Sequence, residues 1–290
     1  MRTWIYLGVA ACLAGLGAVR YGAVPSSYDA AAWQSANPED GKVADGIFVS
    51  DYFDLSYRLP EGWTEGLAGP GPTQFGYYVL GTWTPKHDFV GAVLVVAQDM
   101  FFAPESSEAK NVVAEFRQAM SAVDGMTIDS EPAQVSVGGH LGYRIDFSGV
   151  GLFRSMIAIE LRCHVLTFNL TSRDPEFLAS LVRSLDNLAS VRKKTSDPVP
   201  ECLRDYATSE NVVRRVEPDD VGAKAVSIPV RMIVATDGSV KHVHVIRASA
   251  AQRRNIEEAL RQWKFKSYVK QGRPVEVETG MTFNFKPANM

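Results

Sequence analysis

The sequence predicts an α+β protein with two folded domains behind an N-terminal membrane segment. Three observations lead to this prediction. Residues 3–19 form an uncharged apolar run, residues 46–191 alternate between strand-like and helical patterns, and residues 221–290 follow the order strand, turn, strand, helix, strand. The chain has 290 residues, 46% of them hydrophobic and 22% charged. That composition is ordinary for a globular protein and sufficient for sizeable cores without a metal.

The N-terminal segment, residues 1–21, determines the expected compartment. Arg2 precedes the apolar run and Arg20 closes it. The run is slightly short for a membrane-spanning helix and long for the apolar region of a signal peptide. An uncleaved signal anchor, a cleaved signal peptide and lipidation at Cys12 stay open. All three place the bulk of the chain outside the cytoplasm.

Residues 22–45 are rich in Ala, Ser, Pro, Asn and Asp without sustained periodicity, so we predict a flexible tether. The first domain, residues 46–191, opens with alternating apolar and polar residues over 53–59, which predicts a half-buried strand. Two amphipathic helices are expected, one over 109–120 and one that begins after Asp174, a favoured N-cap residue. Strands between the two helices imply an antiparallel sheet covered by helices.

Residues 192–220 are polar, and we predict a linker with local helix around 201–207. The second domain, residues 221–290, starts with a strand over 226–234. Asp237-Gly238 predicts a hairpin turn, because glycine tolerates the positive φ that such a turn requires. Ser249 is expected to cap a helix that leads to Trp263, and a final strand follows over 275–285. The predicted order is ββαβ.

The second domain resembles the C-terminal domain of TonB-type energy transducers. The matching residues are Asp237-Gly238-Ser239-Val240, Trp263-Lys264-Phe265-Lys266, Gly272-Arg273-Pro274-Val275 and Phe283-Asn284-Phe285. The resemblance implies a non-enzymatic protein-binding domain in the bacterial periplasm, with an outer-membrane receptor as the kind of partner and transmembrane transport as the process. The family's usual Pro-Ala after the Trp-x-Phe element is replaced here by Ser267-Tyr268.

The first domain resembles PsbP-like domains more weakly. The resemblance rests on the strand that ends in Leu59-Pro60-Glu61-Gly62-Trp63 and on the order of the elements that follow. Such domains are mostly binding or assembly modules, so this resemblance also implies no chemistry.

The predicted partner-binding site is the edge of the final strand, where unpaired backbone groups can accept an added strand. Its residues are Val275, Val277, Thr279, Met281 and Phe283, with the basic side chains Lys264, Lys266 and Arg273 nearby. Those charges favour an acidic partner segment. Pro229 cannot donate a ladder hydrogen bond, which argues against a central position for the first strand. A homodimer formed through the same edge is the alternative.

The cysteines agree with export. Outside the N-terminal segment only Cys163 and Cys202 remain, and an oxidising compartment permits a disulfide between them. Two buried, unpaired thiols are the alternative.

The sequence contains none of the common phosphate-binding, dinucleotide-binding or zinc-protease motifs, and we predict no cofactor, no metal site and no enzymatic activity. His242 and His244 lie two residues apart on a predicted strand, so both rings could face one metal, but two solvated histidines are the simpler interpretation. An exported protein is not expected to bind nucleic acid.

Three functions are therefore weighed. The first is a membrane-anchored, TonB-like interaction protein of the envelope. The second is an envelope scaffold or assembly factor without energy transduction, which the lack of a histidine in residues 3–19 favours, because TonB membrane helices usually carry one for motor coupling. The third is a hydrolase or metal-dependent enzyme whose site the sequence does not reveal.

Overall fold

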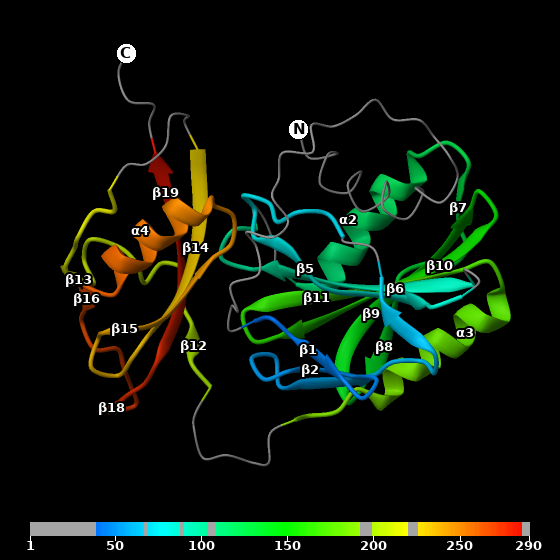
Figure 1. Ribbon diagram of the computed structural model, residues 1–290, viewed down its shortest axis with the longest axis horizontal. Helices are drawn as coiled ribbons and strands as arrows, with labels where there is room; N and C mark the ends of the chain where they lie inside the picture. The colour runs from blue at the N-terminus through cyan, green and yellow to red at the C-terminus, as the bar shows by residue number, and fades with distance from the viewer. Residues whose placement is uncertain are drawn as a thin grey trace.

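The computed structural model describes residues 39–66, 69–87, 90–103, 108–191, 199–219 and 226–285. Figure 1 shows two sheet-based domains side by side, the first built from residues up to 191 and the second from residues 199 onward. The predicted membrane segment, residues 1–21, lies outside the described residues. Among the helices that are described, none is long and apolar enough to cross a membrane.

The first domain is built on an eight-stranded antiparallel sheet. Its strands are β4 (Trp63–Glu65), β5 (Tyr77–Pro85), β6 (Gly91–Asp99), β7 (Met126–Ile128), β8 (Ala133–Val137), β9 (His140–Gly149), β10 (Leu152–Leu161) and β11 (His164–Ser172). Their order is β4-β5-β6-β11-β10-β9-β7, and β8 also pairs with β9. Every residue of the central strand β11 is buried, because both faces of the sheet are covered.

Each face of this sheet has its own core. Helix α2 (Ala109–Ser121) packs on one face through Val113, Phe116 and Met120. Helix α3 (Pro175–Ser184), its 3-10 extension η2 (Leu185–Asn187) and a small sheet of β1 (Lys42–Ala44), β2 (Ile47–Ser50) and β3 (Leu55–Arg58) cover the other (Figure 1). The side chain of Asp174 accepts a hydrogen bond from the Glu176 amide, which confirms the predicted N-cap. The predicted α+β class is confirmed.

The tether prediction, residues 22–45, is wrong from residue 39 onward. Glu39 is buried, and β1 pairs with β2 from Lys42 to Ala44. All three side chains of β1 are exposed, so backbone hydrogen bonds alone form this strand. A strand of that kind leaves no hydrophobic pattern in the sequence.

The second domain contains the predicted ββαβ order with additional short strands. Its elements are β12 (Glu201–Cys202), β13 (Val212–Arg214), β14 (Val226–Val234), β15 (Val240–Val245), α4 (Ala250–Leu260), β16 (Lys264–Phe265), β17 (Val269–Lys270), β18 (Arg273–Pro274) and β19 (Val277–Phe285). The main sheet has the order β12-β19-β14-β15. Helix α4 and Trp263 pack on one face of it, in a core with Ile228, Val230 and Phe283.

Local sequence signals explain two features of this domain. Gly238 has a φ of 86°, and the carbonyl oxygen of Phe265 lies 2.0 Å from where a Cβ would be, so only glycine fits the hairpin. Ser249 accepts a hydrogen bond from the Gln252 amide, and the Gln252 side chain accepts one from the Ser249 amide. This capping box fixes the start of α4.

Two expectations for this region need correction. Residues 201–207, expected to form local helix in a linker, contain strand β12, and Tyr206 is part of the second core. Strand β14 occupies a central position despite Pro229. The Pro229 carbonyl accepts from the Ile246 amide, so the backbone of Pro229 faces the end of β15, where the missing N–H interrupts no ladder.

Candidate partner-binding edge and domain junction

Strand β19 lies next to the edge of its sheet. On one side it pairs with β14 along its whole length. On the other side the two-residue strand β12 covers only Val277 and Glu278. Among the described residues, no strand pairs with β19 beyond Glu278 on that side. The C-terminal half of β19 is therefore an open edge, and we call residues 280–285 the open half of β19.

The backbone of β19 alternates between its two neighbours. The carbonyl oxygens of Glu276 and Glu278 accept hydrogen bonds from Glu201 and Leu203 of the β12 segment, so even-numbered positions face outward. By the same alternation the outward groups of the open half belong to Gly280, Thr282 and Asn284. Thr282 lies opposite Pro229, whose backbone faces away from β19, which agrees with this direction.

The residues predicted for the edge therefore have a different role. Val277, Thr279, Met281 and Phe283 direct their backbone groups toward β14, since they occupy the odd-numbered positions. Val277, Thr279 and Phe283 are buried, Met281 is half-buried, and Val275 precedes β19. The backbone groups of these five residues are therefore not the ones that could pair with an added strand. Four of the five nevertheless belong to β19, which has an open edge formed by other residues.

The three basic side chains predicted near the edge are only partly free to contact a partner. The Nζ of Lys264 lies 3.2 Å from a carboxylate oxygen of Asp237, across the hairpin turn. Lys266 and Arg273 are exposed. Lys264 and Lys266 belong to the segment that contacts β13 and Asn211, so the structure does not gather the three charges along the open half of β19.

The second face of the β19–β14–β15 sheet is covered by the first domain. Arg231 is 1% exposed, and its guanidinium forms ion pairs with Glu39, Asp99 and Glu278. The Nε–Oδ2 distance to Asp99 is 2.9 Å. Ile246 packs into the core of the first domain. We call this group of charged residues the Arg231 cluster.

Further polar side chains surround the Arg231 cluster. The Tyr52 hydroxyl donates to Glu278 and accepts from Arg231. The guanidinium of Arg162 stacks on the Tyr52 ring at 3.9 Å and lies 3.5 Å from Glu278. Tyr78 and the Nε2 of His164 are 2.8 Å apart. These four partners all belong to the first domain, and they add hydrogen bonds and one positive charge around the buried carboxylates.

His244 belongs to the same cluster, contrary to the interpretation of two solvated histidines. It is 5% exposed, and its Nδ1 lies 2.9 Å from Oε2 of Glu39. His242 is exposed. The two rings therefore have different surroundings, because the described residues of the first domain cover only the His244 end of β15. No group of three or more metal-ligating side chains gathers among the described residues.

The cluster shifts the protonation of its members in opposite directions. Burial raises the pKa of Asp99 to about 7, although Arg231 acts to lower it. Burial would also raise the pKa of Glu39, but the charges of Arg231 and His244 lower it to about 2. Burial and the nearby arginine lower the pKa of His164 well below its usual value. The arginine charge is shared among three carboxylates, so the three cannot all be equally stabilised in their ionised forms.

The two domains are also joined covalently. Cys163, in the turn between β10 and β11, forms a disulfide with Cys202 in β12. Cys163 is fully buried, whereas Cys202 is exposed. A bond across 39 positions of sequence restricts the unfolded chain and stabilises the fold by about 4 kcal/mol.

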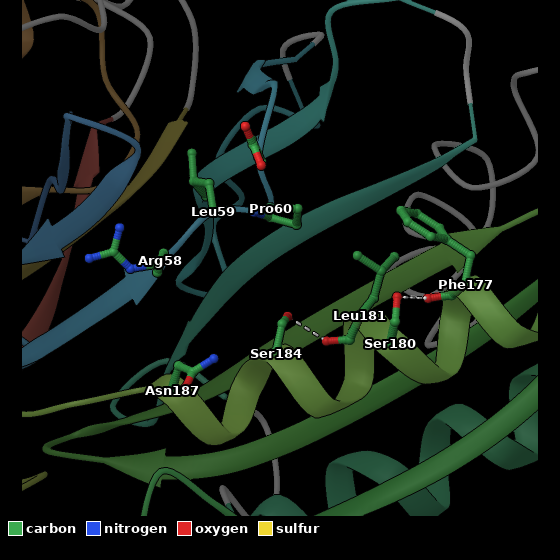
Figure 2. A pocket seen from close by; sticks show the side chains of 9 residues that line it. Arg58, Leu59, Pro60, Phe177, Ser180, Leu181, Ser184 and Asn187 are labelled. Carbon is green, nitrogen blue, oxygen red and sulfur yellow. Dashed lines mark hydrogen bonds between the residues drawn. The ribbon is translucent and has the colours of Figure 1, made fainter.

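A pocket of about 290 Å³ lies between the β3–β4 turn and α3 in the first domain (Figure 2). The Ser180 and Ser184 hydroxyls donate to carbonyl oxygens of α3 itself, at Phe177 and Leu181. Leu59 and Leu181 belong to the core. Both serine hydroxyls are therefore used within the helix, and the two leucines belong to the apolar part of the pocket wall.

Sequence reasoning missed Glu39, Asp99, Arg231 and Glu278. One signal was available for Arg231. Arg231 interrupts the apolar strand 226–234 on the face opposite to the predicted core. An arginine at such a position is usually exposed to solvent. Nothing in the local pattern shows that a second domain covers that face.

A family of known proteins matches the sequence of the second domain. Residues 226–287 match the family model for the Gram-negative bacterial TonB protein C-terminal, so this part of the chain is similar to that domain. No curated protein is significantly similar to the chain.

Three solved structures are each similar to a part of this chain. The Synechocystis sp. PCC 6803 CyanoP (cyanobacterial PsbP) structure has 13% identity and a TM-score of 0.38, covering 52% of this chain and 96% of that one. The Pseudomonas aeruginosa TonB C-terminal domain has 20% identity and a TM-score of 0.25, covering 29% and 93%. A Pseudomonas aeruginosa protein of unknown function, described as a putative regulator, has 16% identity and a TM-score of 0.29, covering 48% and 92%.

Proposed function

We propose that this chain is a TonB-like interaction protein of the bacterial cell envelope. In this proposal the second domain binds a protein partner, such as an outer-membrane receptor, by adding a strand of the partner to the open half of β19. The observation that carries it is the edge of β19, which lacks a strand partner beyond Glu278 among the described residues. Main-chain hydrogen bonds to such an edge supply affinity with little demand on the partner's sequence.

The envelope location has two supports. The family that residues 226–287 match is the C-terminal domain of a Gram-negative bacterial protein. The Cys163–Cys202 disulfide is a bond that persists in oxidising compartments such as the periplasm. Membrane attachment through residues 1–21 completes the proposal.

A proline in place of Thr282 tests the edge. Thr282 is exposed and its N–H faces outward, opposite Pro229, so the substitution removes one donor from the edge without breaking the β14 ladder. We expect Thr282→Pro to reduce strand addition at least tenfold, because a ladder bond is lost and the ring obstructs the added strand. The matched control Thr282→Ala keeps the N–H and is expected to bind normally.

The measurement is photo-crosslinking in cells that express the full chain with a benzophenone amino acid in place of Asn284. Adducts are separated by mass and identified. Adducts that persist unchanged in the proline variant would refute addition at this edge. An adduct of twice the mass of the chain would show that the edge pairs with itself, which is the homodimer alternative.

A scaffold or assembly factor without energy transduction uses the same surface. The two functions differ in their dependence on the proton-motive force. Crosslinks that are unchanged after the force is collapsed support the scaffold, whereas crosslinks that change support an energy transducer.

A further inference from the structure

Residues 201–204 occupy the part of the β19 edge that is not open, and we call them the edge cap. The Glu201 amide donates to the Glu276 carbonyl at 2.8 Å, and the Leu203 amide donates to the Glu278 carbonyl at 2.9 Å. The Thr279 hydroxyl donates to the Arg204 carbonyl at 3.3 Å. The edge cap therefore makes the contacts that an added strand would make, but over only two residues of β12.

So short a strand is not held by its ladder alone, because each backbone hydrogen bond adds little net stability. Leu203 packs against the core of the second domain, and the first domain supplies further attachments. Cys202 is bonded to Cys163, whose carbonyl accepts from the Met100 amide at 3.0 Å. The Arg204 guanidinium donates to the carbonyl oxygens of Met100 and Ala103. An ion pair of 2.7 Å between Glu201 and Lys270 lies at the surface, where such pairs contribute little.

We propose that the edge cap is an internal competitor for the partner strand, and that reduction of the Cys163–Cys202 disulfide releases it. This inference rests on the proposed function, since it concerns the same edge of β19. With the cap in place an added strand meets the outward groups of Gly280, Thr282 and Asn284. Without the cap, Glu276 and Glu278 become available as well, and the edge lengthens toward the start of β19.

The chemical step requires a dithiol reductant. Its thiolate attacks the sulfur of Cys202, because Cys202 is exposed and Cys163 is buried. The S–S bond breaks, and the Cys163 sulfur leaves as a thiolate that takes up a proton. The second thiol of the reductant then attacks the mixed disulfide, which frees the Cys202 thiol and leaves the reductant as a disulfide. Two electrons pass from the reductant to the protein.

Amide hydrogen exchange on the full chain in detergent tests the release directly. The oxidised chain is compared with the dithiothreitol-reduced, alkylated chain and with the double variant Cys163→Ser/Cys202→Ser. We expect exchange over residues 201–203 to become at least tenfold faster in both, while β11 and β14 stay protected. The matched control Lys270→Ala, which removes only the surface ion pair, is expected to exchange like the oxidised chain.

Unchanged protection of residues 201–203 after reduction would overturn the proposal. So would loss of protection throughout β14, because the disulfide would then maintain the domain and not the cap. Crosslinking from position 284 is followed in the same samples and is expected to rise roughly tenfold on reduction, since about two more backbone hydrogen bonds form.

The two proposals fail differently. If the edge cap exchanges fast after reduction but no crosslink forms in either redox state, strand addition is contradicted. The release of the edge cap by reduction is then still supported. Crosslinks that are present but equal in both states contradict regulation by the cap and leave the proposed function intact.

Discussion

Replacing Arg231 by alanine is expected to lower the free energy of unfolding by about 3–5 kcal/mol, since it leaves buried carboxylates without their common counter-charge. Glu39, Asp99 and Glu278 all pair with this one guanidinium, and all three are almost fully buried. The measurement is chemical denaturation at pH 7. Separate fluorescence reporters for each domain show whether the domains also lose their mutual contact.

The matched control for this variant is Arg254→Ala. Arg254 lies on the exposed side of α4, where loss of an arginine changes stability by no more than about 0.5 kcal/mol. A loss below about 1 kcal/mol for Arg231→Ala would contradict the assignment. Such a small loss would mean that protonation or hydration stabilises the buried carboxylates as well as the arginine does.

Asp99 is expected to make the junction pH-dependent, and Asp99→Asn should reveal this. Burial raises the pKa of Asp99 from 3.8 to about 7, and the carboxylates of Glu278 and Glu39 add to that effect, although Arg231 and the Phe101 amide oppose it. The folded protein therefore binds this proton more tightly than the unfolded chain. The stability that Asp99 contributes is complete below pH 4 and is lost as the pH rises toward 7.

His164 opposes this dependence. Its lowered pKa means that the unfolded chain binds the His164 proton more tightly, so this residue reduces stability as the pH falls below about 6.5. Between pH 5 and 6 the two residues therefore act on the stability of the wild type in opposite directions. The difference between Asp99→Asn and the wild type isolates Asp99, because asparagine imitates the protonated carboxyl group.

We expect the variant to gain stability relative to the wild type by about 2–3 kcal/mol between pH 5 and pH 8. Thermal unfolding of both proteins at several pH values measures this difference. Asp124→Asn, at an exposed position after α2, is the control for the loss of an acidic residue elsewhere. A difference that does not change with pH would show that Asp99 titrates alike in the folded and unfolded chain.

The features predicted from sequence are those with local causes. The caps at Asp174 and Ser249 and the turn at Asp237-Gly238 are each predicted from residues that lie within a few positions of each other. The Arg231 cluster depends on partners far apart in the chain, since Glu39 and Arg231 are separated by most of both domains. A pattern with a period of two shows that Arg231 lies on one face of a strand, but it contains no information on what covers that face.

Pro229 illustrates a different reason for failure. Proline avoids central strands because it lacks a backbone N–H donor. That donor matters only where a neighbouring strand offers a carbonyl oxygen to accept its hydrogen bond. The backbone of Pro229 faces β15 just where that strand ends, and this depends on the length of β15. The sequence shows the proline but not where its neighbour stops.

The position of Glu39 determines how tension would travel through the molecule. Glu39 is the first described residue, and its carboxylate is paired with Arg231 and His244 of the second domain. Tension on the backbone at Glu39 therefore acts on its ion pairs with β14 and β15 as well as on the backbone that leads into β1. A load applied at the open half of β19 meets the same strands from the other end. The Arg231 cluster thus connects the residue before β1 to the same sheet that contains the open half of β19.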